Sequence, residues 1–489
     1  MHMKDKNHYL PVIIEYLPLI AVFFLALLVR IVYNETAVRG YVPLEDANFY
    51  NLIARNLLEA HCYCIYLHHS TVSRAPLWPF IIAVIYFFAG EHNAYARLFF
   101  CFIGSGTCVL VYLLAKDLFG KRIALISGVI AAIYTGLFIW DGWLFAESLY
   151  TFCLTVFTYS LYRLQRGTLP VPAEPIAAAS NKFLTVLLRL RQQVGRHRWI
   201  ILSGVFLALA GLTRPNGSGL FGLLFIWVMI VILARIMPWR TVVRAGLVIA
   251  LIGIIIIAPW TYRNYTVSHA FVFISTGIGE VLVGAYSDRV FEDDPNAYGL
   301  WRPPWHTLGH DAPTYTPANE TLDIEHAFTW IRTHLSVMPY LLSLHLENMW
   351  KPVTFVHGFV TFVHGIPMMR EFPTRPSARF VLSLMQTMPI PVYILAALGL
   401  VATLRRWKRL LVVYLVIVMT IAENVFLYGS MRFRSPIEPL LVLLAGGALW
   451  WLTCNEPGTL RYRFSGKKIV HEEAAVHEEA ESESATVTS

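Results

Sequence analysis

Long apolar runs separated by short basic clusters make up most of this chain. A helix that crosses the hydrocarbon core of a bilayer needs about 20 predominantly apolar residues. The runs that approach this length predict about ten membrane-spanning helices. We place them near 15–34, 97–116, 122–140, 146–164, 199–213, 217–237, 242–259, 381–404, 409–428 and 436–453. The pattern therefore predicts an all-α polytopic membrane protein.

The basic clusters predict the orientation of these spans, because Lys and Arg collect in cytoplasmic loops. All the clusters fall on one side if 35–96 is a single external loop. The apolar run 77–90 would break this arrangement if it crossed the membrane, so we expect it to be a helix lying in the membrane interface. The apolar part of 336–370 is expected to be another interfacial helix. The alternative is a hairpin of two further spans, which would give about twelve in total.

The same pattern divides the chain into four parts. A transmembrane module over 1–259 is followed by an external segment over 260–380, by C-terminal transmembrane helices over 381–455 and by an acidic tail over 456–489. The tail has little apolar content, and we expect it to be disordered and cytoplasmic. The first apolar run follows a basic start and lacks a small-residue cleavage site, which predicts a retained signal anchor.

Composition supports the membrane class. Of 489 residues, 56% are hydrophobic and 14% are charged, whereas soluble globular chains have about 25% charged residues. The net charge of +8 does not indicate a nucleic-acid partner, since the basic residues lie in the clusters that set topology. The six cysteines are scattered and predict no disulfide framework.

Five side chains on the predicted external face are candidates for substrate chemistry. Glu45 and Asp46 open an amphipathic stretch that also holds Tyr50, and the next external turn holds Asp141 and Glu147. An Asp at the start of a helix either caps backbone N–H groups or serves a functional site. Glu147 lies within an apolar run, where a carboxylate is costly unless it is paired with an arginine or lies in a polar site.

Arginines border the same predicted face. They are Arg74, Arg263 with its neighbour Asn264, Arg432 and Arg434. Single arginines at this position can snorkel to lipid phosphates. Several of them converging with carboxylates predict a site for an anionic headgroup, because the guanidinium group matches phosphate geometry.

The loop His61-Cys62-Tyr63-Cys64 to His68-His69 contains metal-ligating side chain types. Their spacing matches no familiar zinc pattern, so we predict a surface loop. A metal site, or a disulfide from Cys62 or Cys64 to another part of the chain, is the alternative.

Seven short motifs in order resemble the GT-C glycosyltransferases that use polyprenyl-phosphate sugars, the superfamily of protein O-mannosyltransferases and lipid A aminoarabinose transferases. The resemblance is piecewise and covers most of residues 15–455. The motifs are Asp46, Arg74–Pro79, Val111–Gly120, Ala146–Leu149, Leu212–Pro215, Pro259–Tyr265 and Arg432–Pro439. The resemblance implies the GT-C fold, with interfacial helices in the external loops.

The resemblance also implies roles for individual residues. Asp46 matches the acidic residue of the first external loop that acts as base, and Arg74 and Arg263 match positions that hold the lipid phosphate. Glu147 matches an acidic residue that orients the acceptor or the sugar. Glu45, Tyr50, Asp141, Asn264, Arg432 and Arg434 are candidate substrate-binding residues. No metal is required when arginines stabilise the leaving phosphate, although a divalent metal is not excluded.

The expected function is an inverting transfer of sugar from a polyprenyl-monophosphate donor to an acceptor hydroxyl. The acceptor is a protein, a glycolipid or a polysaccharide, and the expected location is a bacterial inner membrane with the active site on its periplasmic face. A transporter or flippase of lipid-linked sugars, and a polymerase or ligase with a diphosphate-linked donor, are the alternatives. Transporters usually show repeated halves and broken mid-membrane helices, and neither is evident in this sequence.

Overall fold

The computed structural model describes residues 10–67, 69–167, 182–292, 295, 298–302, 316–351, 376–454 and 459–460, with the backbone alone for 10–14, 45 and 182–196. The described part is helical and contains no strand, only an isolated bridge between Cys64 and Ser70. The helices of the first half are α1 (Leu10–Thr36), α2 (Glu45–Glu59), α3 (Leu77–Ala89), α4 (Asn93–Phe119), α5 (Lys121–Ile133), α6 (Thr135–Phe138), η1 (Ile139–Gly142), α7 (Glu147–Gln165), α8 (Lys182–Thr213) and η2 (Pro215–Ser218). Those of the second half are α9 (Gly219–Leu233), α10 (Trp239–Ser268), α11 (Ile278–Ala285), η3 (Asp288–Phe291), α12 (Pro317–Thr333), α13 (Met338–Trp350), α16 (Pro376–Thr387), α17 (Pro389–Thr403), η6 (Leu404–Arg406), α18 (Trp407–Phe426), α19 (Met431–Arg434), η7 (Ser435–Ile437) and α20 (Glu438–Thr453).

The helices confirm the predicted all-α membrane fold. Each of the ten predicted spans coincides with helical residues, and within the described residues six helical segments are long and apolar enough to cross a membrane. A seventh is obtained if the pair 121–133 and 135–142, which bends by 57°, counts as one span. One of the six segments, Pro376–Phe426, contains α16, α17 and α18. The chain is an integral membrane protein.

The structure can be compared with the predicted border at residue 259 and with the predicted interfacial run 77–90. Helix α10 continues unbroken through residue 259, so the predicted border between the first two parts lies inside a helix rather than in a linker. The predicted interfacial run 77–90 forms α3, which has 13 residues and is too short to cross a bilayer. Of the predicted interfacial segment 336–370, Met338–Trp350 form α13, and 352–375 lie outside the described residues.

A buried charge pair connects helices in the core of the bundle. Arg30 on α1 and Asp141 in η1 have side chains that are 0% and 1% exposed, and their Nε and Oδ2 atoms lie 2.6 Å apart. A lone charge at this depth is costly, and pairing lowers that cost. Arg30 also donates to the carbonyl oxygens of Ala26 and Ala132. The pair therefore ties α1 to the turn between α5 and α7.

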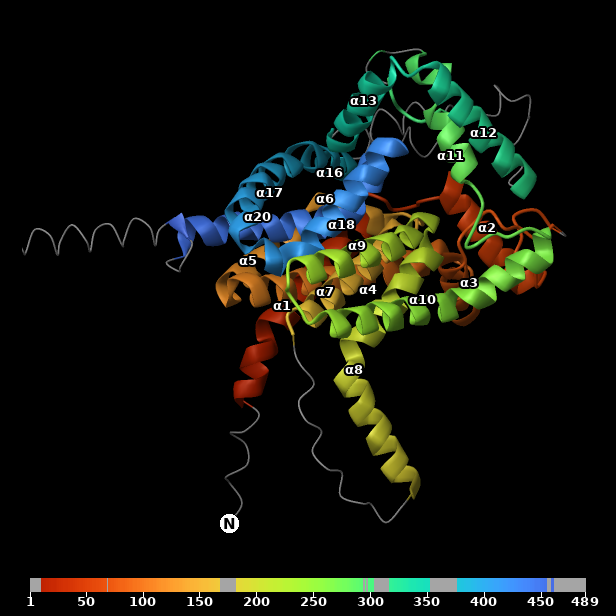
Figure 1. Ribbon diagram of the computed structural model, residues 1–489. Helices are drawn as coiled ribbons and strands as arrows, with labels where there is room; N and C mark the ends of the chain where they lie inside the picture. Colours follow the sequence, from red (N-terminus) through yellow and green to blue (C-terminus); the bar gives the residue numbers. More distant parts are fainter. Residues whose placement is uncertain are drawn as a thin grey trace, which may run out of the picture.

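Figure 1 shows how the remaining helices are arranged around this core. Helices α2 and α3 lie at one end of the bundle, and α11, α12 and α13 form a separate group beside α18. The group of α11, α12 and α13 has its own small apolar core, which includes Val283, Ala327 and Leu341. Its contact with the bundle includes a hydrogen bond from Tyr286 Oη to the carbonyl oxygen of Phe426, at the end of α18.

Candidate active site

Asp46 is held by two arginines that come from distant parts of the chain. It is the second residue of α2, and the N-cap position before it is Leu44, which has no capping side chain bond. Arg74 Nη2 lies 3.1 Å from Asp46 Oδ1, and Arg432 Nη2 lies 2.9 Å from Asp46 Oδ2. Both carboxylate oxygens thus accept from a guanidinium group. Asp46 is therefore engaged with arginine side chains, and its functional role stays a prediction.

Glu147 is the second carboxylate of the same cluster. It is the first residue of α7, and its side chain is 0% exposed. Its Oε1 atom accepts from Arg432 Nε and, at 2.7 Å, from Arg214 Nη1. Arg432 therefore bridges Asp46 and Glu147. The predicted pairing of Glu147 with an arginine is present, and its predicted role in substrate binding stays a prediction.

We call these five residues the acid–arginine cluster: Asp46, Arg74, Glu147, Arg214 and Arg432. Three guanidinium groups and two carboxylates leave the cluster one formal positive charge. Burial decreases toward one side, since the Glu147 side chain is fully buried whereas that of Asp46 is 30% exposed. Asp46 is thus the carboxylate of the cluster that is accessible to solvent.

The charges of the cluster control the acidity of Asp46. Burial acts to raise the pKa of Asp46, but the charges of Arg432 and Arg74 outweigh it and lower this pKa to about 2. Tyr50 lies one turn further along α2, and burial together with the charge of Asp46 raises the pKa of Tyr50 to about 12. Asp46 is therefore an anion and Tyr50 a neutral hydroxyl at physiological pH.

Arg432 is positioned by the turn between α18 and α20. Ser430 Oγ caps α19 by accepting from the backbone N–H of Arg432 at 3.2 Å. Asn424 on α18 donates to the carbonyl oxygen of Phe433 at 3.3 Å. The Arg432 guanidinium carbon lies 4.3 Å from the centre of the Phe145 ring. These contacts aim one flexible side chain at two carboxylates.

Arg434 was predicted beside Arg432, but the structure places it away from the cluster. Its side chain is 1% exposed, and its Nε atom lies 2.8 Å from Glu438 Oε1. It also donates to the carbonyl oxygen of Met349 in α13. Residues 432 and 434 lie on different sides of the short helix α19, because two positions along a helix are about 200° apart. Arg434 thus fixes the turn from which Arg432 projects.

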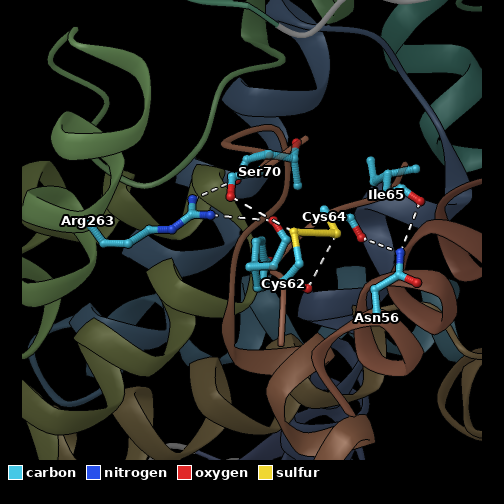
Figure 2. The surroundings of a disulfide bond; sticks show 8 residues. Asn56, Cys62, Cys64, Ile65, Ser70 and Arg263 are labelled. Carbon is cyan, nitrogen blue, oxygen red and sulfur yellow. Dashed lines mark hydrogen bonds between the residues drawn. A yellow bond between two sulfur atoms is a disulfide. The ribbon is translucent and has the colours of Figure 1, made fainter. Parts of the chain in front are cut away.

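Arg263 and Asn264 lie at the loop that leads to Arg74, and not in the cluster itself. Arg263 Nη1 donates to the carbonyl oxygen of Thr71 at 2.6 Å, and Nη2 to that of Tyr63 at 3.4 Å. Figure 2 shows the Arg263 side chain pointing into this loop. Asn264 is buried and donates to the carbonyl oxygens of Val272 and Ile274. The phosphate-binding role predicted for Arg263 stays a prediction.

The other two predicted residues are accounted for as follows. Asp141 lies in the bundle and pairs with Arg30, as described above, so it does not face the cluster. Glu45 is the first residue of α2, and its side chain lies outside the described part of the structure. Sequence reasoning missed Arg214, although the motif Leu212–Pro215 contained it. The signal was a conspicuous one, an arginine directly after an apolar run that is expected to cross the membrane.

The same loop holds a disulfide between Cys62 and Cys64, which the sequence did not predict (Figure 2). Asn56 Nδ2 donates to the carbonyl oxygens of Cys64 and Ile65, at 2.8 and 3.2 Å. With Arg263 on its other side, the loop is anchored at both α2 and α10. His68 lies outside the described residues, and within those described no three His, Cys, Asp or Glu side chains lie close enough to hold a metal ion.

The disulfide predicts the number of reactive thiols in the purified protein. Cys101, Cys108, Cys153 and Cys454 are free. Denatured protein treated with a maleimide is therefore expected to take up about four labels before reduction and about six after it, as read by mass spectrometry. The double variant Cys62→Ser/Cys64→Ser is the control and takes up the same number in both cases. Six labels in unreduced wild type would contradict the pairing.

Comparisons with known proteins agree with this fold. Residues 73–168 match the family described as dolichyl-phosphate-mannose-protein mannosyltransferase. The archaeal oligosaccharyltransferase AglB from Archaeoglobus fulgidus, in complex with an inhibitory peptide and a dolichol-phosphate, is 12% identical, with a TM-score of 0.51 over 89% of this chain and 50% of that chain. ArnT from Cupriavidus metallidurans, bound to undecaprenyl phosphate, is 15% identical, with a TM-score of 0.40 over 91% of this chain and 78% of that chain. No curated protein matches in a sequence search.

The structural comparisons establish the fold of the chain. The chain has the fold of the GT-C superfamily, as the sequence motifs predicted, and it spans about half the length of the oligosaccharyltransferase structures that it resembles. The family match covers Arg74, Glu147 and Asp141 but not Asp46, Arg214 or Arg432. Together these findings show an integral membrane protein with the GT-C fold and a partial match to a mannosyltransferase family.

Proposed function

We propose that the protein transfers a sugar from a polyprenyl-monophosphate donor to an acceptor hydroxyl, with inversion at the anomeric carbon. The observation that carries this proposal is the arrangement at Asp46, a partly exposed carboxylate with one arginine on each oxygen. In this arrangement a proton acceptor is in direct contact with two groups that can bind a phosphate. The reaction needs both.

Asp46 acts as the general base in this proposal. The acceptor hydroxyl gives its proton to the Asp46 carboxylate and attacks the anomeric carbon from the face opposite the phosphate. The bond between the anomeric carbon and the phosphate oxygen breaks, and its electron pair stays on the phosphate. Arg74 and Arg432 stabilise the negative charge that develops there, since fixed guanidinium groups are suited to this task.

In this proposal Glu147 and Arg263 position the residues that contact the substrates. Glu147 orients Arg432 and Arg214 through its Oε1 atom. Removing it would leave two guanidinium groups with one partner fewer in a buried place, which is costly. Arg263 grips the loop that carries Arg74, and its contacts with backbone carbonyl oxygens favour a positioning role over the direct phosphate contact that the motif resemblance implied.

The identity of the donor rests on the lipid surroundings and on the relatives. A polyprenyl tail stays in the bilayer, so its headgroup reaches a site at the end of a helix bundle, where α2 and α3 lie (Figure 1). The oligosaccharyltransferase of similar fold binds a dolichol-phosphate. We propose the periplasmic face of a bacterial inner membrane as the location. A protein, a glycolipid or a polysaccharide is the proposed acceptor, and no metal is assigned a step.

A direct assay tests this function. Purified protein in detergent receives undecaprenyl-phosphate-hexose or dolichyl-phosphate-mannose, with a Ser/Thr-rich peptide, a lipid A-like glycolipid or a polysaccharide as acceptor. Release of the polyprenyl monophosphate, with gain of one hexose by an acceptor or by water, is the expected result. Protein in vesicles that moves the donor across the bilayer without transfer is a flippase. Transfer from diphosphate-linked donors alone indicates a polymerase or ligase. Either outcome would contradict the proposal.

A further inference from the structure

The two arginines proposed to bind the donor phosphate are already occupied in the structure. Arg74 Nη2 and Arg432 Nη2 each donate to an oxygen of Asp46. The acceptor hydroxyl needs one of those oxygens, and the donor phosphate needs those guanidinium groups. While Asp46 is paired in this way, its carboxylate is not available to the acceptor hydroxyl. The two guanidinium groups are likewise not available to the donor phosphate.

Both arginines have a second anchor that allows them to leave Asp46 without losing their place. Arg432 keeps its Nε contact with Glu147, which is fully buried and bound to Arg214 as well. Arg74 Nη1 donates to the carbonyl oxygen of Ser73 at 3.1 Å, and its guanidinium carbon lies 4.9 Å from the Phe49 ring centre. Each arginine thus has one contact that it can keep and one contact, with Asp46, that it can exchange for a ligand. Asp46 is the more exposed carboxylate of the cluster, and the one that a ligand meets first.

We propose that the donor phosphate and Asp46 compete for Arg74 and Arg432, so that donor binding releases Asp46 to act as base. The inference rests on the function proposed above. In the resting protein the arginines pair with Asp46, and the arriving phosphate takes them over. Asp46 is then free to accept the hydroxyl proton as the new bond to the anomeric carbon forms and the bond to the phosphate oxygen breaks.

The same competition returns the site to its resting state. After transfer, Asp46 is a neutral acid and does not attract the arginines. Once its proton passes to water, the carboxylate competes again and displaces the lipid phosphate product. The low pKa of Asp46, caused by Arg432 and Arg74 against the effect of burial, agrees with this, since a carboxylate held by two arginines is a weak base. By thermodynamic linkage, phosphate binding to the two arginines must in turn weaken their interaction with Asp46.

The test is the affinity for undecaprenyl phosphate, measured by isothermal titration calorimetry in detergent. Asp46→Asn removes the competing charge, so we expect it to bind undecaprenyl phosphate about five- to tenfold more tightly than wild type. Arg74→Gln and Arg432→Gln are expected to bind it more weakly. In the double variant Asp46→Asn/Arg432→Gln, the gain from Asp46→Asn is expected to shrink, because one of its two competed groups is gone.

The matched control is Asp117→Asn. Asp117 is also a partly exposed carboxylate held by two arginines, Arg163 at 2.9 Å and Arg166 at 3.7 Å, but it lies at the far end of α4. Its removal is expected to leave the affinity unchanged. Equal or weaker binding by Asp46→Asn would overturn the competition, and Asp46→Ala, measured alongside, gives the answer if the asparagine variant does not fold. If the proposed function itself is wrong, the wild-type protein will not transfer sugar, and this result is distinct from the binding measurements.

Discussion

Asp46→Asn is expected to lower the rate of sugar transfer by about 10²–10⁴-fold, the range in which a positioned general base contributes. Asparagine keeps the shape of the side chain and removes the site that takes the acceptor proton. The paired arrangement also predicts that the arginines stay in place, because Arg432 keeps Glu147 and Arg74 keeps Ser73. The measurement is the turnover of polyprenyl-phosphate-hexose by purified protein at saturating donor.

The control for this prediction is a carboxylate outside the cluster. Asp288 in η3 has a side chain that is 83% exposed, and Asp288→Asn is expected to leave turnover unchanged. Thermal unfolding of both variants shows whether they fold. A folded Asp46→Asn protein that transfers sugar at the wild-type rate would rule out Asp46 as the base, while leaving the class of the protein untouched. Slower transfer together with tighter binding of undecaprenyl phosphate would support both the base and the competition.

The sequence predicted the helices well because the bilayer imposes a simple rule. A span must be apolar over about 20 residues, and this pattern can be found without knowing any tertiary contact. The short helix α3 was predicted from the charge distribution, because a crossing by Leu77–Ala89 would put the next basic cluster on the external side. Such predictions use only the order of apolar and basic residues along the chain and need no knowledge of how the helices pack.

Pairings between segments were the part that the sequence did not reveal. The pattern placed Asp141 on the same face as Glu147, and only six positions separate them. In the structure Asp141 pairs with Arg30, which lies 111 residues earlier, toward the end of the first span, whereas Glu147 pairs with Arg214 and Arg432. Each carboxylate is satisfied by whichever arginine the helix packing brings near, and packing between helices is not written in the local pattern.

The same reasoning explains Arg434 and Arg263. A run such as Arg432-Phe433-Arg434 suggests two equivalent charges, but a helix turns one toward the cluster and the other toward Glu438. Arg263 on α10 contacts the loop that leads to Arg74, yet its guanidinium group donates to carbonyl oxygens of that loop. Residue type and order predicted that arginines and carboxylates converge, and the side chain directions decide which arginines take part. That they form an anion site stays a prediction.

The packing around the buried pair of Arg30 and Asp141 leads to the largest expected effect on stability. Gly104 on α4 lies directly against this pair. A Cβ atom at position 104 would lie 2.6 Å from Arg30 Nε and closer still to Asp141 Oδ2. Both groups are almost completely buried, so any shift that makes room for the Cβ atom separates or strains the pair. Gly104→Ala therefore forces the ion pair apart within the bundle.

We expect Gly104→Ala to lower the free energy of unfolding by about 3–5 kcal/mol, the cost of separating a buried ion pair. Gly222→Ala is the matched control, since Gly222 is also in a helix of the bundle, α9, and a Cβ there meets nothing within 4 Å. It is expected to be neutral or slightly stabilising, because alanine favours helix more than glycine does. Thermal unfolding of the two variants in the same detergent measures the difference. Equal stability would mean that α4 does not press on the pair.

The position of Asp141 extends this effect to the active site. Asp141 lies in η1, and the chain from η1 runs through Leu144 to Glu147. Tyr41, between α1 and α2, accepts from the backbone N–H of Leu144 at 3.2 Å. Displacing Asp141 therefore moves the turn from which Glu147 holds Arg432. Those Gly104→Ala molecules that remain folded are expected to bind undecaprenyl phosphate more weakly than wild type, whereas Gly222→Ala binds it normally. Normal binding by folded Gly104→Ala would show that the buried pair stabilises the bundle without positioning the site.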